Sequence, residues 1–136
     1  MPPPGELFLS HASADRETAS EIAITLKQLG IATFFAPSHI QGAQQWQDEI
    51  LGALKRCEWF VVLLSPDSVK SMWVRRETAY ALNESRYENR IVPVMLRDCD
   101  LESLDWLRLF QIVDFTGDRD AGYRNLRRVW GIRTSS

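Results

Sequence analysis

Short apolar runs alternate with amphipathic segments along the chain. The apolar and β-branched runs predict five strands, at 7–9, 31–35, 59–64, 91–96 and 111–115. Apolar residues at helical spacing predict helices between them, at about 19–29, 46–54, 71–85 and 119–130, with a short helix or turn at 101–109. Gly30 fits the position just after the first helix, where a left-handed backbone is common. Pro37 and Gly42 predict a loop over 36–44.

This alternation predicts an α/β fold with a mainly parallel sheet and helices on both of its faces. The strands are almost unbroken apolar runs, as in parallel sheets that are buried on both sides. The usual strand order at this size is 2-1-3-4-5. Pro93 inside the fourth strand predicts an irregular or unpaired position. We expect a flexible N-terminal tail at 1–5, one domain at 6–133 and a tail at 134–136.

Composition narrows the classes of function. A length of 136 residues, 45% apolar and 25% charged, is typical of one globular domain. A net charge of −2 gives no reason to expect nucleic acid or an anionic membrane as a partner. No apolar run is long enough to span a bilayer, and the N-terminus lacks the pattern of a secretory signal. Cys57 and Cys99 are isolated, which favours free thiols in a reducing cytoplasm. With only His11 and His39, a histidine-rich metal site is not expected.

The carboxyl ends of parallel strands meet at one edge of the sheet, where open α/β folds bind ligands. The segments predicted to meet there are Ser10–Ser13, Ala36–Ser38, Ser65 and Arg97–Asp98. The N-terminus of the first helix, at about Asp15, could offer N–H groups to a phosphate. Alternatively, Ser13 and Asp15 simply cap that helix. The sequence leaves both interpretations open.

Trp73 and Glu77 stand one helical turn apart, just after the third strand. A flat ring can stack on a base, and a carboxylate can hold sugar hydroxyls or stabilise a cationic sugar. The pair therefore suggests a nucleotide ligand and glycosidic chemistry. Both residues lie beside the predicted buried stripe of their helix, so spacing leaves open whether Glu77 is solvated or at the rim of a cleft. Trp46 is either a core residue on its own apolar stripe or a platform for a ligand.

Several other sites are excluded by missing motifs. The chain has no G-x-x-x-x-G-K-[ST], no G-x-G-x-x-G and no G-x-S-x-G. A phosphorylation receiver would need acidic residues after the first strand and an aspartate after the third. Ser10-His11 and Ser65-Pro66 occupy those places.

Five segments together resemble the Toll/interleukin-receptor (TIR) domain family in its bacterial form. They follow the family order and are Phe8–Ser13, Gly30–Phe35, the BB loop at Ala36–Gly42 with Trp46 and Ile50 after it, Cys57–Ser65, and Ser71–Glu77. The resemblance covers residues 6 to about 130. It implies the flavodoxin-like fold, a three-layer sandwich around a five-stranded sheet.

Some members of this family are scaffolds that only assemble, and others are enzymes that cleave NAD at the nicotinamide–ribose bond. The resemblance implies these site residues: Glu77 as the catalytic glutamate, Trp73 lining the same pocket, Trp46 facing the ligand, and His11, Ala12 and Ser13 contacting the nucleotide. NAD is then a substrate, and neither a cofactor nor a metal is expected. The resemblance also implies self-association through the loop Pro37–Gln44.

The chain departs from the family pattern at three places. Val74 stands where cysteine is frequent. The arginine that animal members often carry near the positions of Ala12 and Ser13 is absent, which leaves phosphate recognition to backbone N–H groups or Arg16. Gln41 replaces the proline that often precedes the glycine of the BB loop. The last departure bears on receptor-type scaffolding contacts more than on catalysis.

The resemblance predicts an NAD glycohydrolase or cyclase that forms nicotinamide plus ADP-ribose or a cyclic ADP-ribose. Its expected setting is the bacterial cytoplasm, in immune (anti-phage) or stress signalling. One alternative is a non-catalytic TIR interaction module, which the retention of Trp73 and Glu77 disfavours. Another is an enzyme like the nucleoside deoxyribosyltransferases, which the TIR-like BB loop disfavours.

Overall fold

The computed structural model describes the backbone of residues 3–35 and 43–132, and the side chains of 3–35 and 47–132. Its strands form one sheet in the order β2-β1-β3-β4-β5, and each neighbouring pair is parallel. The strands are β1 (Glu6–Ser10), β2 (Ala32–Phe34), β3 (Trp59–Leu64), β4 (Ile91–Met95) and β5 (Val113–Asp114). The predicted order and parallel sheet are confirmed.

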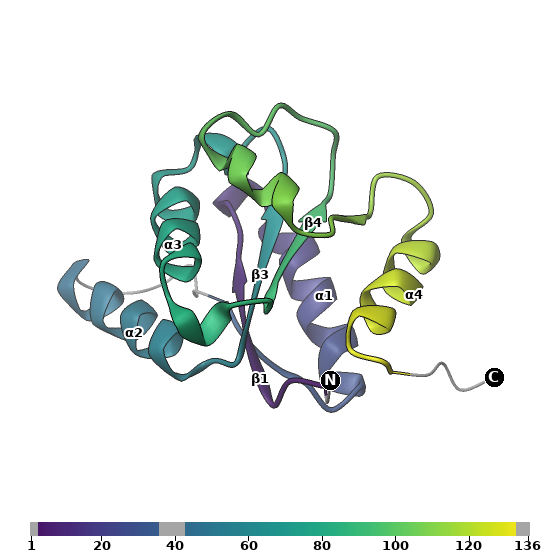
Figure 1. Ribbon diagram of the computed structural model, residues 1–136, viewed down its shortest axis with the longest axis horizontal. Coiled ribbons are helices and arrows are strands. Elements are labelled where there is room, and N and C mark those ends of the chain that lie inside the picture. Colours follow the sequence, from purple (N-terminus) through teal and green to yellow (C-terminus); the bar gives the residue numbers. More distant parts are fainter. Residues whose placement is uncertain (1–2, 36–42, 133–136) are drawn as a thin grey trace.

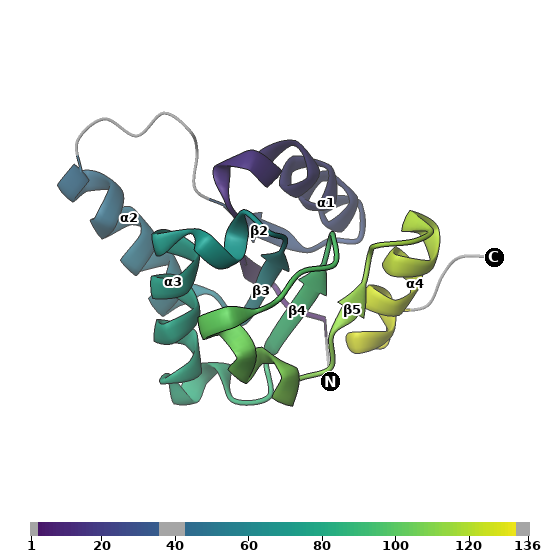
Figure 2. The ribbon, with the colours of Figure 1, turned by 90° about the horizontal axis from the view of Figure 1, so that it is seen from above.

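Helices cover both faces of this sheet (Figures 1 and 2). The α-helices are α1 (Arg16–Gln28), α2 (Ala43–Arg56), α3 (Met72–Leu82) and α4 (Arg119–Val129). The 3₁₀ turns are η1 (Ser13–Asp15), η2 (Ser68–Lys70), η3 (Ser85–Tyr87) and η4 (Glu102–Leu109). Alternate residues of β3 enter two separate cores, one shared with α1 and α4 and the other with α2, α3 and η4. This arrangement confirms the three-layer sandwich.

Gly30 ends the first helix as the sequence predicts, whereas the irregular or unpaired position predicted at Pro93 is wrong on the β3 side, where the register is continuous. Gly30 follows α1 with a φ of +84°, and the N–H of Ile31 donates to the Leu26 carbonyl, which closes the end of the helix. Pro93 lies inside β4 and pairs in register with Val62 of β3. Along a strand, the N–H groups of successive residues point alternately toward the two neighbouring strands. The N–H of Leu96 donates toward β3. Position 93 is an odd number of residues away, so the N–H that proline lacks would point toward β5. Since β5 is paired only with Val94 and Met95, Pro93 removes no bond from the sheet.

The predicted end of α3 at about Ser85 is wrong, because this helix stops at Leu82. The 3₁₀ turn η3 follows and places Tyr87 in the core, where its hydroxyl donates to the Leu54 carbonyl. The last strand is also shorter than the predicted 111–115. None of the helices in the described part of the chain is both long and apolar enough to cross a membrane. The division into one domain and two tails stays a prediction.

Candidate active site

A polar cluster holds three loops together at the carboxyl edge of the sheet. Asp15, just before α1, accepts hydrogen bonds from Ser65 Oγ after β3 and, over 2.9 Å, from Arg97 Nη2 after β4. The Asp15 side chain is 1% exposed, whereas that of Arg97 is 55% exposed. Ser65 and Ser68 also bond to each other across the turn that leaves β3. Two of the segments predicted to meet at this edge, Ser65 and Arg97–Asp98, therefore do so, and Asp15 joins them.

The alternative in which Ser13 and Asp15 cap the first helix is wrong. Asp15 occupies the capping position of α1, but its side chain makes no hydrogen bond to the first turn. Ser13 belongs to the short 3₁₀ turn that precedes the helix. The reason is competition, since Ser65 and Arg97 already bind the Asp15 carboxylate. Phosphate binding at this helix end stays a prediction.

Glu77 lies on α3, which begins after Ser71, whose Oγ accepts the N–H of Val74. Glu77 is only 6% exposed. The solvated position that the sequence left open is therefore wrong, and the carboxylate is buried. Ser10 Oγ, at the end of β1, donates to Glu77 Oε1 over 2.7 Å. Burial raises the pKa of Glu77 to about 7, and the hydrogen bond from Ser10 opposes part of that rise.

Trp73 precedes Glu77 by one turn of α3 and is partly buried. The guanidinium of Arg76 lies 5.5 Å from the centre of its ring, a cation–π contact. The two residues that the sequence singled out therefore lie one turn apart on the first half of α3. A cation of the same helix therefore already lies over this ring.

The predicted nucleotide contacts divide between buried and exposed positions. His11 follows Ser10 directly and is partly buried, with its ring edge-on to Phe35 at 5.7 Å. Burial lowers the pKa of His11, so this ring is neutral near pH 7. Ala12 is buried and Ser13 is exposed. Because His11 adjoins Ser10, the structure brings this loop to the same corner of the sheet as Glu77.

Trp46 lies in the first turns of α2, but its side chain falls outside the described residues. Most of the loop Pro37–Gln44 lies outside them as well. Their roles in binding and self-association stay predictions. Among the side chains that are described, no three metal-binding groups cluster together.

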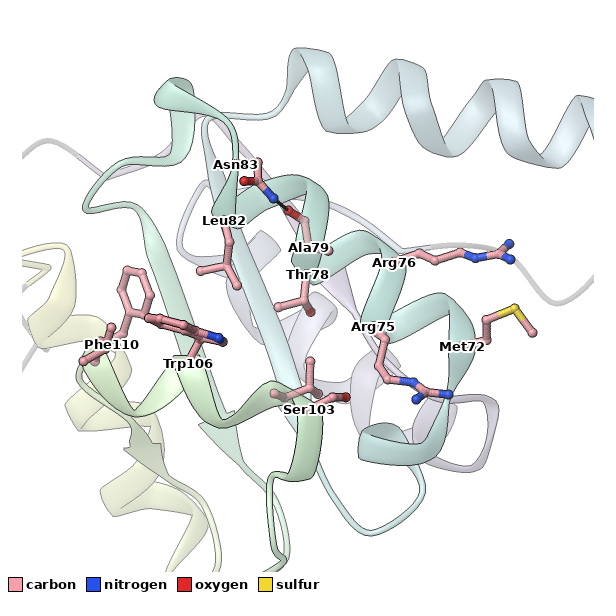
Figure 3. Close-up of a pocket in the computed structure, with 12 residues that line it drawn as sticks. Met72, Arg75, Arg76, Thr78, Ala79, Leu82, Asn83, Ser103, Trp106 and Phe110 are labelled. Carbon is pink, nitrogen blue, oxygen red and sulfur yellow. Dashed lines mark hydrogen bonds between the residues drawn. The ribbon is translucent and has the colours of Figure 1, made fainter.

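A separate groove of about 760 Å³ runs between α3 and η4 (Figure 3). Four of the six exposed large apolar side chains in the described part of the chain line it: Met72, Leu82, Trp106 and Leu109. Figure 3 shows Arg75 and Arg76 toward one end and Trp106 and Phe110 toward the other. Glu77 is not among its lining residues, so the groove and the buried carboxylate use different sides of α3.

Two curated relatives carry the names of cyclases. The chain is 27% identical over 101 residues to a probable 2′ cyclic ADP-D-ribose synthase of Methanobrevibacter olleyae, covering 74% of this chain and 29% of that protein. It is also 27% identical over 106 residues to the 2′ cyclic ADP-D-ribose synthase AbTIR of Acinetobacter baumannii, covering 76% of this chain and 39% of the relative. The chain thus spans well under half the length of both.

Solved structures share the fold. The TIR domain of a Toll-related receptor from Hydra magnipapillata superimposes with a TM-score of 0.74 at 22% identity, covering 90% of this chain and 94% of the other. A prokaryotic SEFIR domain gives 0.70 at 15% identity, with 95% and 94% covered. The TIR domains of the activated Roq1 resistosome give 0.67 at 18%, with 91% and 98% covered. The family model described as "TIR domain" matches residues 7–128. With its sheet order and its Trp73–Glu77 helix matching what the motifs predicted, this chain belongs to the TIR domain family.

Proposed function

We propose that this chain is an NAD-cleaving TIR domain that breaks the bond between nicotinamide and ribose. The observation that carries the proposal is the buried carboxylate of Glu77, which lies one helical turn from Trp73 and bonds to Ser10 at the carboxyl end of β1. Burial of a carboxylate without a paired cation costs folding free energy, and groups with perturbed pKa values concentrate at functional sites. The names of the two curated relatives support the same chemistry.

The reaction needs little acid catalysis. The pyridinium of NAD is cationic, so the bond between ribose C1′ and the nicotinamide nitrogen breaks with its electron pair moving to the ring, which leaves as neutral nicotinamide. The ribose then resembles an oxocarbenium ion, as in glycoside hydrolysis. One fixed carboxylate beside C1′ stabilises that charge, and this is the role of Glu77. Trp73 supplies the flat apolar wall against which the leaving ring is positioned.

The second step decides the product. Attack of water on C1′ with loss of a proton gives ADP-ribose. Attack by a hydroxyl of the same molecule, again with loss of a proton, gives a cyclic ADP-ribose. A carboxylate with a pKa of about 7 can accept that proton near neutrality. The relatives are named for 2′ cyclic products, which favours the cyclic outcome here.

We further propose that the activity serves cytoplasmic immune or stress signalling and requires self-association through the loop Pro37–Gln44. A site walled by one helix and one loop would stay wet, and water weakens electrostatic stabilisation of the transition state. A neighbouring copy would complete the wall and exclude water.

A second candidate function is a TIR interaction module without catalysis. It is favoured by the apolar groove between α3 and η4, because exposed apolar surface on this scale commonly marks an interaction site. Turnover separates the two candidates. A module that only assembles would leave NAD intact at every protein concentration.

The deciding experiment is incubation of the purified protein with NAD and identification of products by mass spectrometry. We expect nicotinamide together with ADP-ribose or a cyclic ADP-ribose. Glu77→Ala and Glu77→Gln should reduce the rate by about 100-fold or more, the cost of losing one preorganised electrostatic group. Glu49→Gln, which changes an exposed glutamate on α2, is the matched control. A folded Glu77→Gln protein with full activity would refute the assignment.

A further inference from the structure

The hydroxyl of Ser10 donates a hydrogen bond to the buried carboxylate of Glu77. The donor and acceptor come from positions 67 residues apart, one at the end of β1 and the other on α3. Ser10 is 1% exposed, so bulk water does not replace it as the donor. The bond reaches only Oε1, and the second carboxylate oxygen, Oε2, receives no donor from the described side chains. The carboxylate is therefore held on one side and available on the other.

The direction of this bond favours the ionised carboxylate. An ionised carboxylate can only accept, so the serine must donate to it, and hydrogen bonds to charged groups are the stronger ones. Burial acts in the opposite sense by favouring the neutral acid. These two opposing causes set the pKa of Glu77 at about 7. Loss of the donor would leave burial unopposed.

No charged group in the described part of the chain takes over this role. The elements that pack most closely against α3 are β1, β3, η2 and η4. The charged or titratable groups on these elements or directly beside them, with those of α3 itself, are Glu6 on β1 and His11 after it, Glu58 before β3, Asp67 before η2 and Lys70 on it, Glu102, Asp105 and Arg108 on η4, and Arg75, Arg76 and Tyr80 on α3. β3 has only apolar side chains. The causes that shift the pKa of Glu77 are burial and Ser10, and none of these groups is among them.

We propose that Ser10 is the positioning residue of the site: it fixes Glu77 Oε1, keeps the carboxylate ionised at neutral pH and directs Oε2 toward the ribose. This inference rests on the proposed function, because it assigns the ionised form of Glu77 as the active one. Ser10 does not itself touch the reacting atoms. Its identity as a hydroxyl donor, rather than its size, is what the site requires.

The first test is the pH dependence of kcat/KM for NAD cleavage. Ser10→Ala should move the acidic limb upward by about one pH unit, which corresponds to an activity loss of about fivefold at pH 7 that shrinks toward pH 9. Ser10→Thr keeps the hydroxyl and should restore the limb. Ser65→Ala is the matched control, because it removes another buried serine donor from the same edge, one bound to Asp15 instead. It should leave the position of the limb unchanged.

The second test needs no turnover. In protein labelled with ¹³C at glutamate carboxyls, the Glu77 signal is the one absent from Glu77→Gln, and its titration midpoint should rise by the same amount in Ser10→Ala. A midpoint that does not move, or one that Ser65→Ala moves equally, overturns the inference about Ser10. If the midpoint moves as expected but the wild-type protein never cleaves NAD, the proposed function fails while the contact between Ser10 and Glu77 stands. A shift in both the midpoint and the limb supports both.

Discussion

Replacing Glu77 with glutamine should stabilise the protein at pH 8 far more than at pH 5. The folded protein binds this proton with a pKa of about 7, whereas the ordinary value is 4.5. Between those values the folded state holds more protons than the unfolded state, so stability falls as the pH rises through this window and then levels off. Ionisation of the buried Glu77 side chain therefore lowers the unfolding free energy, and the neutral amide of glutamine avoids this loss.

The magnitude follows from the size of the shift. A difference of 2.5 pH units, from 4.5 to about 7, corresponds to about 3 kcal/mol of unfolding free energy in full. Of this, about 2.5 kcal/mol is lost between pH 5 and pH 8. For a domain of this length that is roughly 8 °C in melting temperature. Ser10 can still donate to the amide oxygen of glutamine, so the variant keeps this contact.

The assay is urea unfolding of the wild type and Glu77→Gln at pH 5, 6, 7 and 8, with Glu49→Gln as the control for an exposed helical glutamate. The gain in stability of Glu77→Gln over the wild type should grow steadily across this series, while that of the control stays flat. A gain that is the same at pH 5 and pH 8 would show that folding does not raise the pKa of Glu77, and the reasoning would fail.

Three further predictions concern the rest of the site. Trp46→Ala should lower both the melting temperature and NAD turnover, because loss of a core tryptophan costs roughly 3–5 kcal/mol of unfolding free energy. Trp73→Ala should mainly lower turnover. The reverse pattern in melting curves and rates would mean that the roles of the two tryptophans are exchanged. Arg97→Ala should destabilise the fold by about 1–3 kcal/mol, because it leaves the buried carboxylate of Asp15 without its cation, and equal unfolding midpoints with the wild type would contradict this. Turnover per molecule should rise with protein concentration and fall in a Gly42 variant that also assembles less, as followed by light scattering; full turnover from a nanomolar monomer would leave a single-chain site instead.

Much of the architecture could be predicted because it depends on local patterns. The six apolar residues of β3 and the helical spacing of Ala19, Ile22 and Leu26 identify their elements without knowledge of any distant contact. The order of the strands followed from the few ways in which parallel strands and helices connect. The pairing of Trp73 with Glu77 also needed only helical spacing. Family membership followed from motifs in order along the chain.

Only the tertiary structure decided what those residues do to one another. Helical spacing placed Glu77 beside the buried stripe of α3 but could not say that it is buried, since burial depends on how α3 packs against β1. It could not pair Glu77 with Ser10 across 67 residues. Nor could it foresee that Asp15 leaves its own helix uncapped, because Ser65 and Arg97 compete for the carboxylate from two other strands. Local sequence sets which conformations a segment prefers, whereas the protonation and partners of a buried group depend on neighbours that only folding brings within reach.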